Sequence, residues 1–585
     1  KPQWALLGAT FIAICSFLPL YLAPASVAEI VKPLFVVLAV SLGLSWILAL
    51  CQTTTFGNFI LKEAVPGGAM KDPYDTKLYH KFEKFLTLLI KRRFVTLTTV
   101  FVTLVLSLVI MAVMPQSFFP KMNKPYFRAD LVFPEGFSIH AVDQDVMKVE
   151  DYLKNHEKVK SYSVTLGGTP LRYYLASSSF GPKSNYANVM VETKDPEDAA
   201  EVEQQFYEHM TQNFPNIITR SALFALSPVP EAAIEIGFIG ENPDTLTALV
   251  ERAKKIARQC DMVTDIRSNW GDKVPVWKPM FSQQKGLRLG ITRQQVANSF
   301  RTATNGLPLG EYREGDVSLP ILLKDEDVEK MNLNDVKSVP VFSTKGNSVK
   351  VEQVIDNFAL GYDYNVVRRF NRERCMMMQC EPKRGANTMA AFKQVLTAVQ
   401  EQMRLPEGYK MKYFGEQETQ DVSNAALAKN IPLTFLLIYV VLLFLFPSNY
   451  RKPVLIMLML PLVFIGVVWG LLLFGKSLDF FAILGLLGLI GMNIKNAIVL
   501  VDEIGLQLKD GKGAVPAVVE ATKTRIVPVT MASGTTILGM LPLLGDAMFA
   551  GMAATIMGGL FVSTVLTIFV LPVTYCIFFK IRADR

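Results

Sequence analysis

Eight long apolar runs constrain this chain more than any other feature of its sequence. Each run reaches or approaches the roughly 20 residues that an α-helix needs to cross about 30 Å of hydrocarbon. The runs cover residues 3–22, 31–51, 94–114, 429–447, 453–474, 479–503, 526–545 and 552–579. Half of all residues are hydrophobic, which agrees with this pattern. We therefore predict an integral membrane protein with eight helical spans in this chain.

Basic residues between the runs predict its orientation in the bilayer. They gather in the loop 52–93, at Arg451 and Lys452, in the loop 509–523 and in the tail 580–585. The positive-inside rule places all four on the cytoplasmic side, and alternation of the spans then puts residues 115–428 outside. Because the basic residues are spread over the ends of apolar runs, the net charge of +8 does not indicate a nucleic-acid site.

The outer segment 115–428 is soluble in character and long enough for two or three subdomains. Alternating strands and amphipathic helices follow one another in β-α-β order, beginning with FRADLVF at 127–133, and such units form a sheet with helices on one face. The stretch 273–350 is richer in Pro, Gly and charge, which predicts an inserted, exposed subdomain. The predicted fold class is a polytopic α-helical membrane protein with a large α+β outer domain.

An internal repeat adds to this organisation. Residues 17–52 resemble residues 540–576, because each segment has a span that ends in Leu-Pro-Leu, a short outer loop and a long second span. Repeats in transporters are commonly whole halves of the molecule. If 94–579 is one half, residues 1–52 are the last two spans of another, so we expect an N-terminal half outside this chain.

The predicted domains follow from these boundaries, and they place the outer segment between one span and five. They are spans of the first half at 1–52, a cytoplasmic loop with an amphipathic helix at 53–93, one span at 94–114, outer subdomains at 115–272, the inserted subdomain at 273–350, completion of the second outer unit at 351–428, five spans at 429–579 and a tail at 580–585.

Lys495 lies inside GLIGMNIKNAIVLVDEI at 488–504, a stretch that is otherwise almost wholly apolar up to its end. A charge in hydrocarbon costs several kcal/mol, so the ammonium should face protein or water and have a partner. Asp502 lies seven residues along the helix, roughly 10 Å away along the axis, which exceeds comfortable reach. We therefore expect the partner of Lys495 outside this chain, and a structural or snorkelling lysine is the alternative.

Three stretches carry a resemblance to a known family: GxxxKNAIVLVDE at 491–503, TRIVPVTMASGTTILGMLPL at 524–543 and the RxNRxR strand at 369–374. Over essentially its whole length the chain resembles the C-terminal half of a resistance-nodulation-division (RND) multidrug exporter. The resemblance implies a proton-driven homotrimer in the inner membrane of Gram-negative bacteria. Such a pump takes substrate from the periplasm and passes it through an adaptor protein to an outer-membrane channel, with no cofactor and no enzymatic reaction.

The same resemblance implies a proton relay within the spans. In the family, two aspartates on a span of the N-terminal half receive the lysine that corresponds to Lys495. The relay then takes four residues from this chain: Lys495, Arg525, Asn496 and Ser533. The hydroxyl that is typical of the following span falls on Ala532 here, and the substitutes one turn or less away are Thr530, Ser533 and Thr536.

The resemblance also implies a substrate cleft between the outer subdomains. The residues that correspond to its walls are Phe224, Leu226, Arg267 and Asn269, with Met190 and Tyr162 in a deeper pocket and a switch loop carrying Tyr173, Tyr174 and Phe180. Aromatic and thioether side chains with few polar anchors bind varied amphiphiles. Ordinary core packing is the alternative for each aromatic. Arg128 and Asp130 lie on a strand face that is apolar in other drug exporters, which indicates more polar or charged substrates.

Two further patterns suggest other chemistry. GLLLFGKS at 470–477 fits the phosphate-loop pattern, but it ends an apolar run on the outer side, so we predict no ATP site and an interfacial role for Lys476. CMMMQC at 375–380 offers soft ligands for copper or silver. Alternation along a strand puts Cys375 and Met377 on one face and the other three sulfur-bearing residues on the opposite face, so we predict core packing and no metal site. A disulfide among Cys260, Cys375 and Cys380 stays open.

The resemblance to RND exporters implies that the chain belongs to a proton-driven exporter of hydrophobic and amphiphilic drugs. A heavy-metal cation exporter is the alternative within transport. A membrane-anchored binding or assembly protein without transport is the alternative of another class, and the acidic partners of Lys495 would separate it from a proton-coupled pump.

Overall fold

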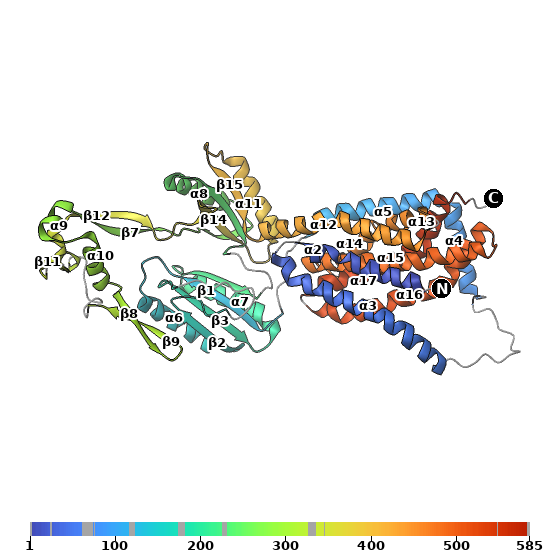
Figure 1. Cartoon of the computed structure of the whole chain (residues 1–585), viewed down its shortest axis with the longest axis horizontal. Coiled ribbons are helices and arrows are strands. Elements are labelled where there is room, and N and C mark those ends of the chain that lie inside the picture. The colour runs from blue at the N-terminus through green and yellow to red at the C-terminus, as the bar shows by residue number, and fades with distance from the viewer. Residues whose placement is uncertain are drawn as a thin grey trace. The chain divides into compact units, whose positions relative to one another are not determined.

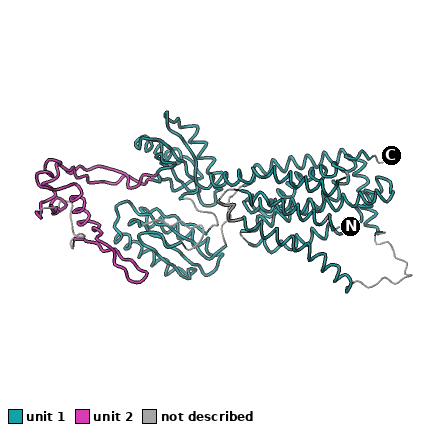
Figure 2. The backbone as a smooth tube through the Cα atoms, viewed as in Figure 1, with its two compact units in different colours: residues 1–269, 369–585 teal, residues 270–368 magenta. Residues whose placement is uncertain are grey.

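A computed structural model of the chain describes residues 3–23, 26–60, 74, 76–115, 123–172, 182–224, 231–325, 335–343, 346–447, 449–546 and 548–581. The chain forms two compact units (Figure 2). The first comprises Lys1–Asn269 and Arg369–Arg585, and the second comprises Trp270–Arg368. The first unit contains a helical bundle and two β/α lobes, and the second is an insertion in the second lobe.

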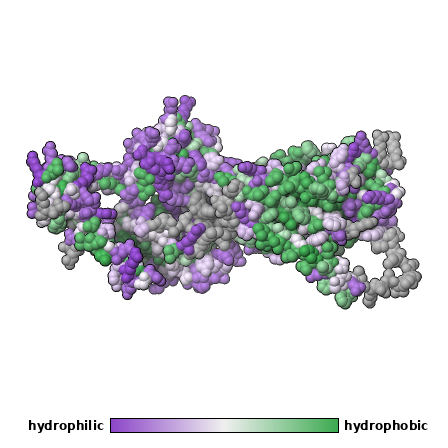
Figure 3. Space-filling model, in the orientation of Figure 1, coloured by the Kyte–Doolittle hydropathy of each residue, from purple (hydrophilic) through white to green (hydrophobic). Residues whose placement is uncertain are grey.

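The bundle is built from the two ends of the chain (Figure 1). Its helices are α1 (Gln3–Ser16), α2 (Leu18–Leu22), α3 (Ser26–Ile60), α4 (Lys77–Lys91), α5 (Arg93–Val113), α12 (Gly415–Leu445), α13 (Arg451–Leu458), α14 (Val463–Leu473), α15 (Phe480–Lys509), α16 (Ala514–Met540) and α17 (Ala550–Phe578). Among the described residues, seven helical segments are long and apolar enough to cross a membrane, and Leu6–Leu22 is a shorter apolar segment. Hydrophobic residues cover the middle of the visible bundle surface, and hydrophilic residues gather at the end near the C-terminus (Figure 3).

The two segments of the internal repeat have similar structures. In the first, the short helix α2 begins at Leu-Pro-Leu and the long helix α3 follows. In the second, the short 3₁₀ helix η5 (Leu541–Gly545) begins at Leu-Pro-Leu and α17 follows. Proline suits the first turn of a helix because its missing N–H has no partner there in any case.

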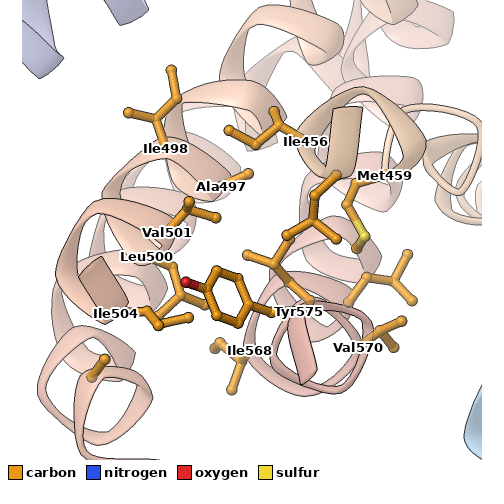
Figure 4. Packing of buried hydrophobic residues seen from close by; sticks show 14 of the residues in the cluster. Ile456, Met459, Ala497, Ile498, Leu500, Val501, Ile504, Ile568, Val570 and Tyr575 are labelled. Atoms are coloured by element: carbon orange, nitrogen blue, oxygen red, sulfur yellow. The ribbon is translucent and has the colours of Figure 1, made fainter. Parts of the chain in front are cut away.

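Helices α15 and α17 form the centre of the bundle. Of the most apolar window in each segment, 72% is buried in α17, 67% in α15 and 61% in α13–α14, against 0% to 22% in α3, α5, α12 and α16. Figure 4 shows buried side chains of the cluster to which both helices contribute: Ala497, Ile498, Leu500, Val501 and Ile504 of α15 and Ile568, Val570 and Tyr575 of α17, with Ile456 and Met459. These contacts fix α15, the helix that carries Lys495.

Lobe A consists of residues 123–172 and 182–224. Its antiparallel sheet has the order β2 (Val159–Leu166), β3 (Tyr186–Thr193), β1 (Tyr126–Val132), β4 (Ile218–Leu223). Helices α6 (Ile139–Lys154) and α7 (Ala199–Asn213) cover one face, where Phe127, Ala129 and Leu131 pack against them. Since side chains alternate along a strand, residues 126, 128 and 130 lie on the face without helices.

Lobe B consists of residues 231–269 and 369–414. Its sheet has the order β13 (Arg369–Phe370), β14 (Glu373–Pro382), β5 (Ile234–Ile239), β15 (Lys410–Phe414), and β6 (Val263–Ser268) also pairs with β14. Helices α8 (Pro243–Ala257) and α11 (Thr388–Gln402) pack on one face. The side chain of Asn242 accepts from the backbone of the first turn of α8 and begins that helix. Strand β15 continues at Gly415 directly into the bundle helix α12.

The second unit has its own core. Strands β7 (Lys273–Phe281) and β12 (Ile355–Tyr364) form a two-stranded ribbon, and β8 (Leu307–Glu314) and β9 (Val317–Leu323) form a hairpin. The smaller elements are α9 (Gln283–Leu289), α10 (Arg293–Thr302), η3 (Asp335–Ser338), β10 (Pro340–Phe342), β11 (Ser348–Lys350) and η4 (Val351–Gln353). The subdomain predicted at 273–350 lies within this unit, which also includes the second strand of the ribbon.

Candidate functional site

Lys495 is exposed on α15, although most residues around it in the helix are buried. Among the described residues, it makes no ion pair and no hydrogen bond. The ammonium of a lysine within a membrane-spanning helix needs a counter-ion or access to water. The structure therefore leaves the ammonium on a face of the bundle where a group from outside this chain can reach it.

The neighbouring Asn496 points into the bundle and is 8% exposed. Its Nδ2 lies 3.5 Å from Ser533 Oγ of α16, a long hydrogen bond. Ser533 Oγ is in turn 2.6 Å from Thr564 Oγ1 of α17. One turn away, Ser563 Oγ donates to Asn493 Oδ1 at 2.6 Å. Of the predicted relay residues, the structure thus joins Asn496 and Ser533, and it adds three polar residues that the sequence analysis missed.

Arg525, the fourth predicted relay residue, pairs with Glu503 of α15. Its Nε and Nη2 lie 3.1 and 2.5 Å from Glu503 Oε2, and Gln507 Nε2 donates to the other carboxylate oxygen at 2.8 Å. Glu503 is eight residues from Lys495, which is about 12 Å along a helix axis. The structure therefore ties Arg525 to the other end of α15, away from Lys495, while Ala532 is exposed and Ser533 is buried.

The helix-free face of lobe A changes from aromatic to charged along its strands. At one end the rings of Tyr126 and Phe224 stack, with centroids 6.0 Å apart. In the middle, Arg128 lies opposite Met190 in the register of β1 and β3. Further on, Asp130 lies between Asn188 of β3 and Arg220 of β4. Phe224 and Met190 therefore share this face with charged residues.

Asp130 is held firmly on this face. Its Oδ1 accepts from the Tyr186 hydroxyl at 2.6 Å and from Asn188 Nδ2 at 2.8 Å. Burial, followed by the nearby Asp130 carboxylate, raises the pKa of the Tyr186 phenol, so that this hydroxyl stays protonated and donates. Tyr162, in contrast, packs against the core on the helix-covered face, so the structure does not bring it together with Met190.

Arg267 and Asn269 of the predicted cleft are engaged within lobe B. Arg267 is 8% exposed; its guanidinium pairs with Asp265, donates to the Glu231 carbonyl at 2.8 Å and lies 3.6 Å from Glu381. The backbone and side chain of Asn269 both bond to the backbone of Met377. These contacts hold both side chains inside the lobe.

A buried acid, Glu235, lies in register with Arg267 in the lobe B sheet. Glu235, Gln379 and Arg267 are opposite one another on β5, β14 and β6. Glu235 is 7% exposed, and burial raises the pKa of its carboxyl to about 7, although the Gln379 amide, which donates at 2.8 Å, opposes the shift. This carboxyl therefore exchanges its proton near neutral pH.

Two ion pairs join the lobes at strand β4. On the helix-covered side, Arg384 of lobe B donates to both oxygens of Glu203 and to Ser221 Oγ. On the opposite face of β4, Arg220 Nε lies 3.3 Å from Asp265 Oδ2 of lobe B. Consecutive residues of this edge strand are thus held from both sides, which keeps the lobes together in this structure.

Four predicted site residues lie outside the described residues: Leu226 of the cleft and Tyr173, Tyr174 and Phe180 of the switch loop. Their predicted roles stay predictions.

The two patterns that suggested other chemistry have ordinary structural surroundings. Gly470 of the phosphate-loop pattern lies within α14, where a Cβ would be 2.7 Å from the Ala554 carbonyl of α17, so the first half of the pattern is the end of a packed helix. Cys375 lies on the helix-free face of β14, beside Met377 and Phe414. Burial raises the pKa of the Cys375 thiol to about 11 and that of the Cys380 thiol to about 12.

These buried thiols are free, as is Cys260. Protonated thiols are poor metal ligands, because metals bind the thiolate. Among the described residues, no group of three or more His, Cys, Asp and Glu side chains is arranged to hold a metal ion.

Comparison with known proteins gives consistent matches along the chain. The profile of the AcrB/AcrD/AcrF family matches residues 2–579. The multidrug export protein AcrF of Escherichia coli (strain K12) is 23% identical over 98% of this chain and 57% of its own length. The nickel and cobalt resistance protein CnrA of Cupriavidus metallidurans is 27% identical over 60% of this chain and 33% of its own length.

A solved structure of a heavy metal efflux pump has the same fold. It superposes with a TM-score of 0.78 at 17% identity, covering 98% of this chain and 58% of the pump. The chain thus spans little more than half the length of that pump and of AcrF.

Proposed function

Because this chain belongs to the AcrB/AcrD/AcrF family, an RND efflux family, we propose that it is the C-terminal transport half of an efflux permease driven by the proton gradient. Its substrates are hydrophobic and amphiphilic compounds. In this proposal the bundle helices use the proton gradient. The two β/α lobes bind substrate in a cleft between them and then release it.

The observation that carries the proposal is the position of Lys495. It is an exposed cation on the central helix α15 and has no partner among the described residues. Ionised carboxylates outside this chain attract the ammonium, and protonation of those carboxylates weakens the attraction. Each proton that binds and leaves therefore changes the force between α15 and its neighbour, which is how a local charge change becomes a conformational one.

The connection from the bundle to lobe B suits this mechanism. Strand β15 passes at Gly415 into α12 without an intervening loop. A Cβ at Gly415 would lie 2.9 Å from the Ala233 carbonyl, and the residue has φ +80°, so the junction is closely packed against the start of β5. A movement of α12 is therefore transmitted directly to the lobe B sheet.

The helix-free face of lobe A supports an amphiphilic substrate. The stacked rings of Tyr126 and Phe224 offer an apolar surface, and Arg128 and Asp130 follow along the same strand. A molecule with an apolar body and a charged or polar head matches this order of side chains.

A metal cation is the second candidate substrate. Relatives named for nickel, cobalt and cadmium resistance support it, and so does the charged part of the same face. The sulfur-bearing cluster does not carry this alternative, because Met376, Met378 and Cys380 are at most 1% exposed on the helix-covered side of lobe B. Replacing Met376 and Met378 with Leu is expected to leave any copper or silver tolerance unchanged.

The proposal includes the surroundings of the pump. The chain lies in a Gram-negative inner membrane with both lobes and the inserted unit in the periplasm, and it works as a homotrimer with an adaptor protein and an outer-membrane channel. Single cysteines at Ser184 and Lys512, in a version without native cysteines, test the orientation by labelling intact cells with an impermeant maleimide. Labelling is expected at Ser184 alone, and labelling at Lys512 alone contradicts the orientation.

Efflux measurements test the transport function. Cells that lack other pumps and express the whole transporter are loaded with ethidium, and its release is followed with and without a protonophore; growth on nickel is measured in parallel. Lys495→Met keeps the length of the side chain and deletes its charge, so we expect release or tolerance to fall about tenfold or more at unchanged protein amount.

Lys476→Met is the matched control, since Lys476 follows the end of α14; it should behave as wild type. If the wild-type protein transports neither ethidium nor nickel under any condition, the binding-protein alternative is favoured. Normal transport by Lys495→Met overturns the assigned role of this lysine.

A further inference from the structure

Five polar side chains are buried where α15, α16 and α17 meet. They are Asn493 and Asn496 of α15, Ser533 of α16, and Ser563 and Thr564 of α17. Their exposed fractions are between 1% and 8%. Buried polar groups within a membrane-spanning bundle need partners in the protein, either one another or the backbone, because hydrocarbon cannot replace the bonds to water that they lose.

The hydroxyls of Ser533 and Thr564 form a chain with one direction. Thr564 Oγ1 lies 2.7 Å from the Leu560 carbonyl of its own helix and 2.6 Å from Ser533 Oγ. A hydroxyl has a single hydrogen, so Thr564 donates to the carbonyl and accepts from Ser533. Ser533 then accepts from the Asn496 amide, and every hydroxyl hydrogen of the chain has an acceptor.

A second link fixes α15 one turn further along. Ser563 Oγ donates to Asn493 Oδ1 at 2.6 Å. Asn493 and Asn496 are three residues apart and therefore lie on nearly the same side of the helix, about 60° from each other. Lys495 is roughly 100° from Asn496 and 160° from Asn493. Asn493 is thus anchored nearly opposite the lysine, and Asn496 about a quarter turn from it.

Two links at different heights restrict both rotation and sliding of a helix. Apolar packing already holds α15 against α17, for example where Leu489 lies against Gly559. Such packing is less directional than hydrogen bonds, which require particular donors to meet particular acceptors. Apolar packing therefore holds α15 against α17, and the polar residues determine the rotation of α15 about its own axis.

We propose that Asn493, Ser563 and Thr564 are positioning residues that hold α15 in the rotation at which Lys495 faces its partner. This inference rests on the proposed role of Lys495 in transport. It gives α17, which carries no residue of the predicted relay, a part in coupling: the adjacent Ser563 and Thr564 fasten α15 directly and through α16.

A labelling experiment tests the rotation without reference to a substrate. In the whole transporter without native cysteines, Lys495→Cys is reacted with N-ethylmaleimide, in backgrounds with and without Ser563→Ala and Thr564→Val. We expect the labelling rate to change about fivefold or more when both hydroxyls are removed, because α15 is then free to rotate. Equal rates in the two backgrounds, including no labelling in either, overturn the inference.

Transport by the same hydroxyl variants, with Lys495 intact, supplies the second readout. Ser563→Ala with Thr564→Val should lower the maximal efflux rate of the probe that wild type transports about fivefold, with the half-saturating concentration unchanged, because the substrate cleft is in the lobes. Thr564→Ser retains the hydroxyl and should restore the rate when Ser563 is present. A raised half-saturating concentration with a normal maximal rate contradicts a positioning role.

Thr574→Val is the matched control on the same helix. Thr574 is 4% exposed, and its hydroxyl donates only to the Val570 carbonyl of α17 at 2.8 Å, so its loss should change neither readout. If Lys495→Met transports normally, the proposed function fails. If Lys495→Met is inactive while the double hydroxyl variant labels and transports as wild type, only the positioning inference fails.

Discussion

Arg384 donates from its two terminal nitrogens to the two carboxylate oxygens of Glu203, at 2.6 and 2.5 Å. The arginine comes from the loop after β14 in lobe B and the glutamate from α7 in lobe A. The guanidinium also lies over the Tyr207 ring, 4.3 Å from its centroid. Two parallel hydrogen bonds with a stacked ring form a strong arrangement for an arginine, so this pair is a main link between the lobes.

Arg384→Ala is expected to loosen lobe A from lobe B. Glu203, whose side chain is 10% exposed, would then be buried without its cation. The expected cost is about 1–3 kcal/mol. This is less than for a fully buried ion pair, because Arg384 is partly exposed. Hydrogen exchange of the whole transporter should show faster exchange in α7 and β4. Lys148→Ala, which removes an exposed pair with Asp145, is the control. Unchanged exchange in α7 contradicts the link.

The proton on Glu235 predicts a pH dependence of stability. Its carboxyl has an ordinary pKa of 4.5 and a pKa of about 7 in the folded lobe, so folding favours the protonated form. The stability from this group is fully present below pH 4.5 and is lost as pH rises through about 7, at most about 3 kcal/mol. Glu235→Gln should therefore raise the melting temperature at about pH 8 relative to wild type, and much less at about pH 4.

The matched control for this measurement is Glu241→Gln, since Glu241 is exposed at the end of β5. It should shift the melting temperature of the purified transporter equally at both pH values. A Glu235→Gln variant that is less stable than wild type at the higher pH contradicts the buried-proton explanation.

Arg267 and Phe224 are expected to differ sharply as mutants. Arg267→Ala removes the cation that Asp265 and Glu381 share, although Arg220 still lies 3.3 Å from Asp265. The cost is at most about 3 kcal/mol, the lower end for a broken buried pair, so folded protein and transport of all substrates should fall together. Phe224→Ala removes one ring of the stack with Tyr126 and should alter transport of aromatic substrates more than of others. Arg258→Ala, on the exposed end of α8, is the control.

Resistance profiles over several drugs, with protein amount measured for each variant, distinguish these outcomes. Normal expression of Arg267→Ala with a changed drug profile would place this arginine at the substrate after all.

Gly558→Ala should disrupt the packing of α14 on α17. A Cβ at Gly558 would lie 2.4 Å from the Gly470 Cα and 2.7 Å from the Gly466 carbonyl, and backbone atoms of a packed helix cannot move aside cheaply. We expect a several-fold loss of monodisperse protein in size-exclusion chromatography of a fluorescent fusion. Gly534→Ala in α16, where nothing lies within 4 Å of the added Cβ, should leave the amount unchanged.

The sequence by itself determined the features that depend on local periodicity. Long apolar runs correspond to long helices because a span needs a fixed number of apolar residues, and alternation along β14 placed Cys375 and Met377 on the face opposite Met376 and Met378. The absence of a nearby acid along α15 also indicated that Lys495 has no partner in its own helix, and no partner is found among the described residues. The break at Phe17 between α1 and α2 differs from the single span expected over 3–22, because that run is apolar apart from Gln3, Thr10 and Ser16.

Only the tertiary structure decided which distant residues meet. Arg267 lies in lobe B beside Glu381, Arg384 reaches Glu203 from 181 positions away in the chain, and Ser533 bonds to Thr564 of another helix. None of these pairs has a signal in sequence spacing, because Arg, Glu, Ser and Thr are common and any of them can face solvent. Their partners are selected by the packing of whole sheets and helices, which places a few side chains within about 3 Å of one another and leaves others apart.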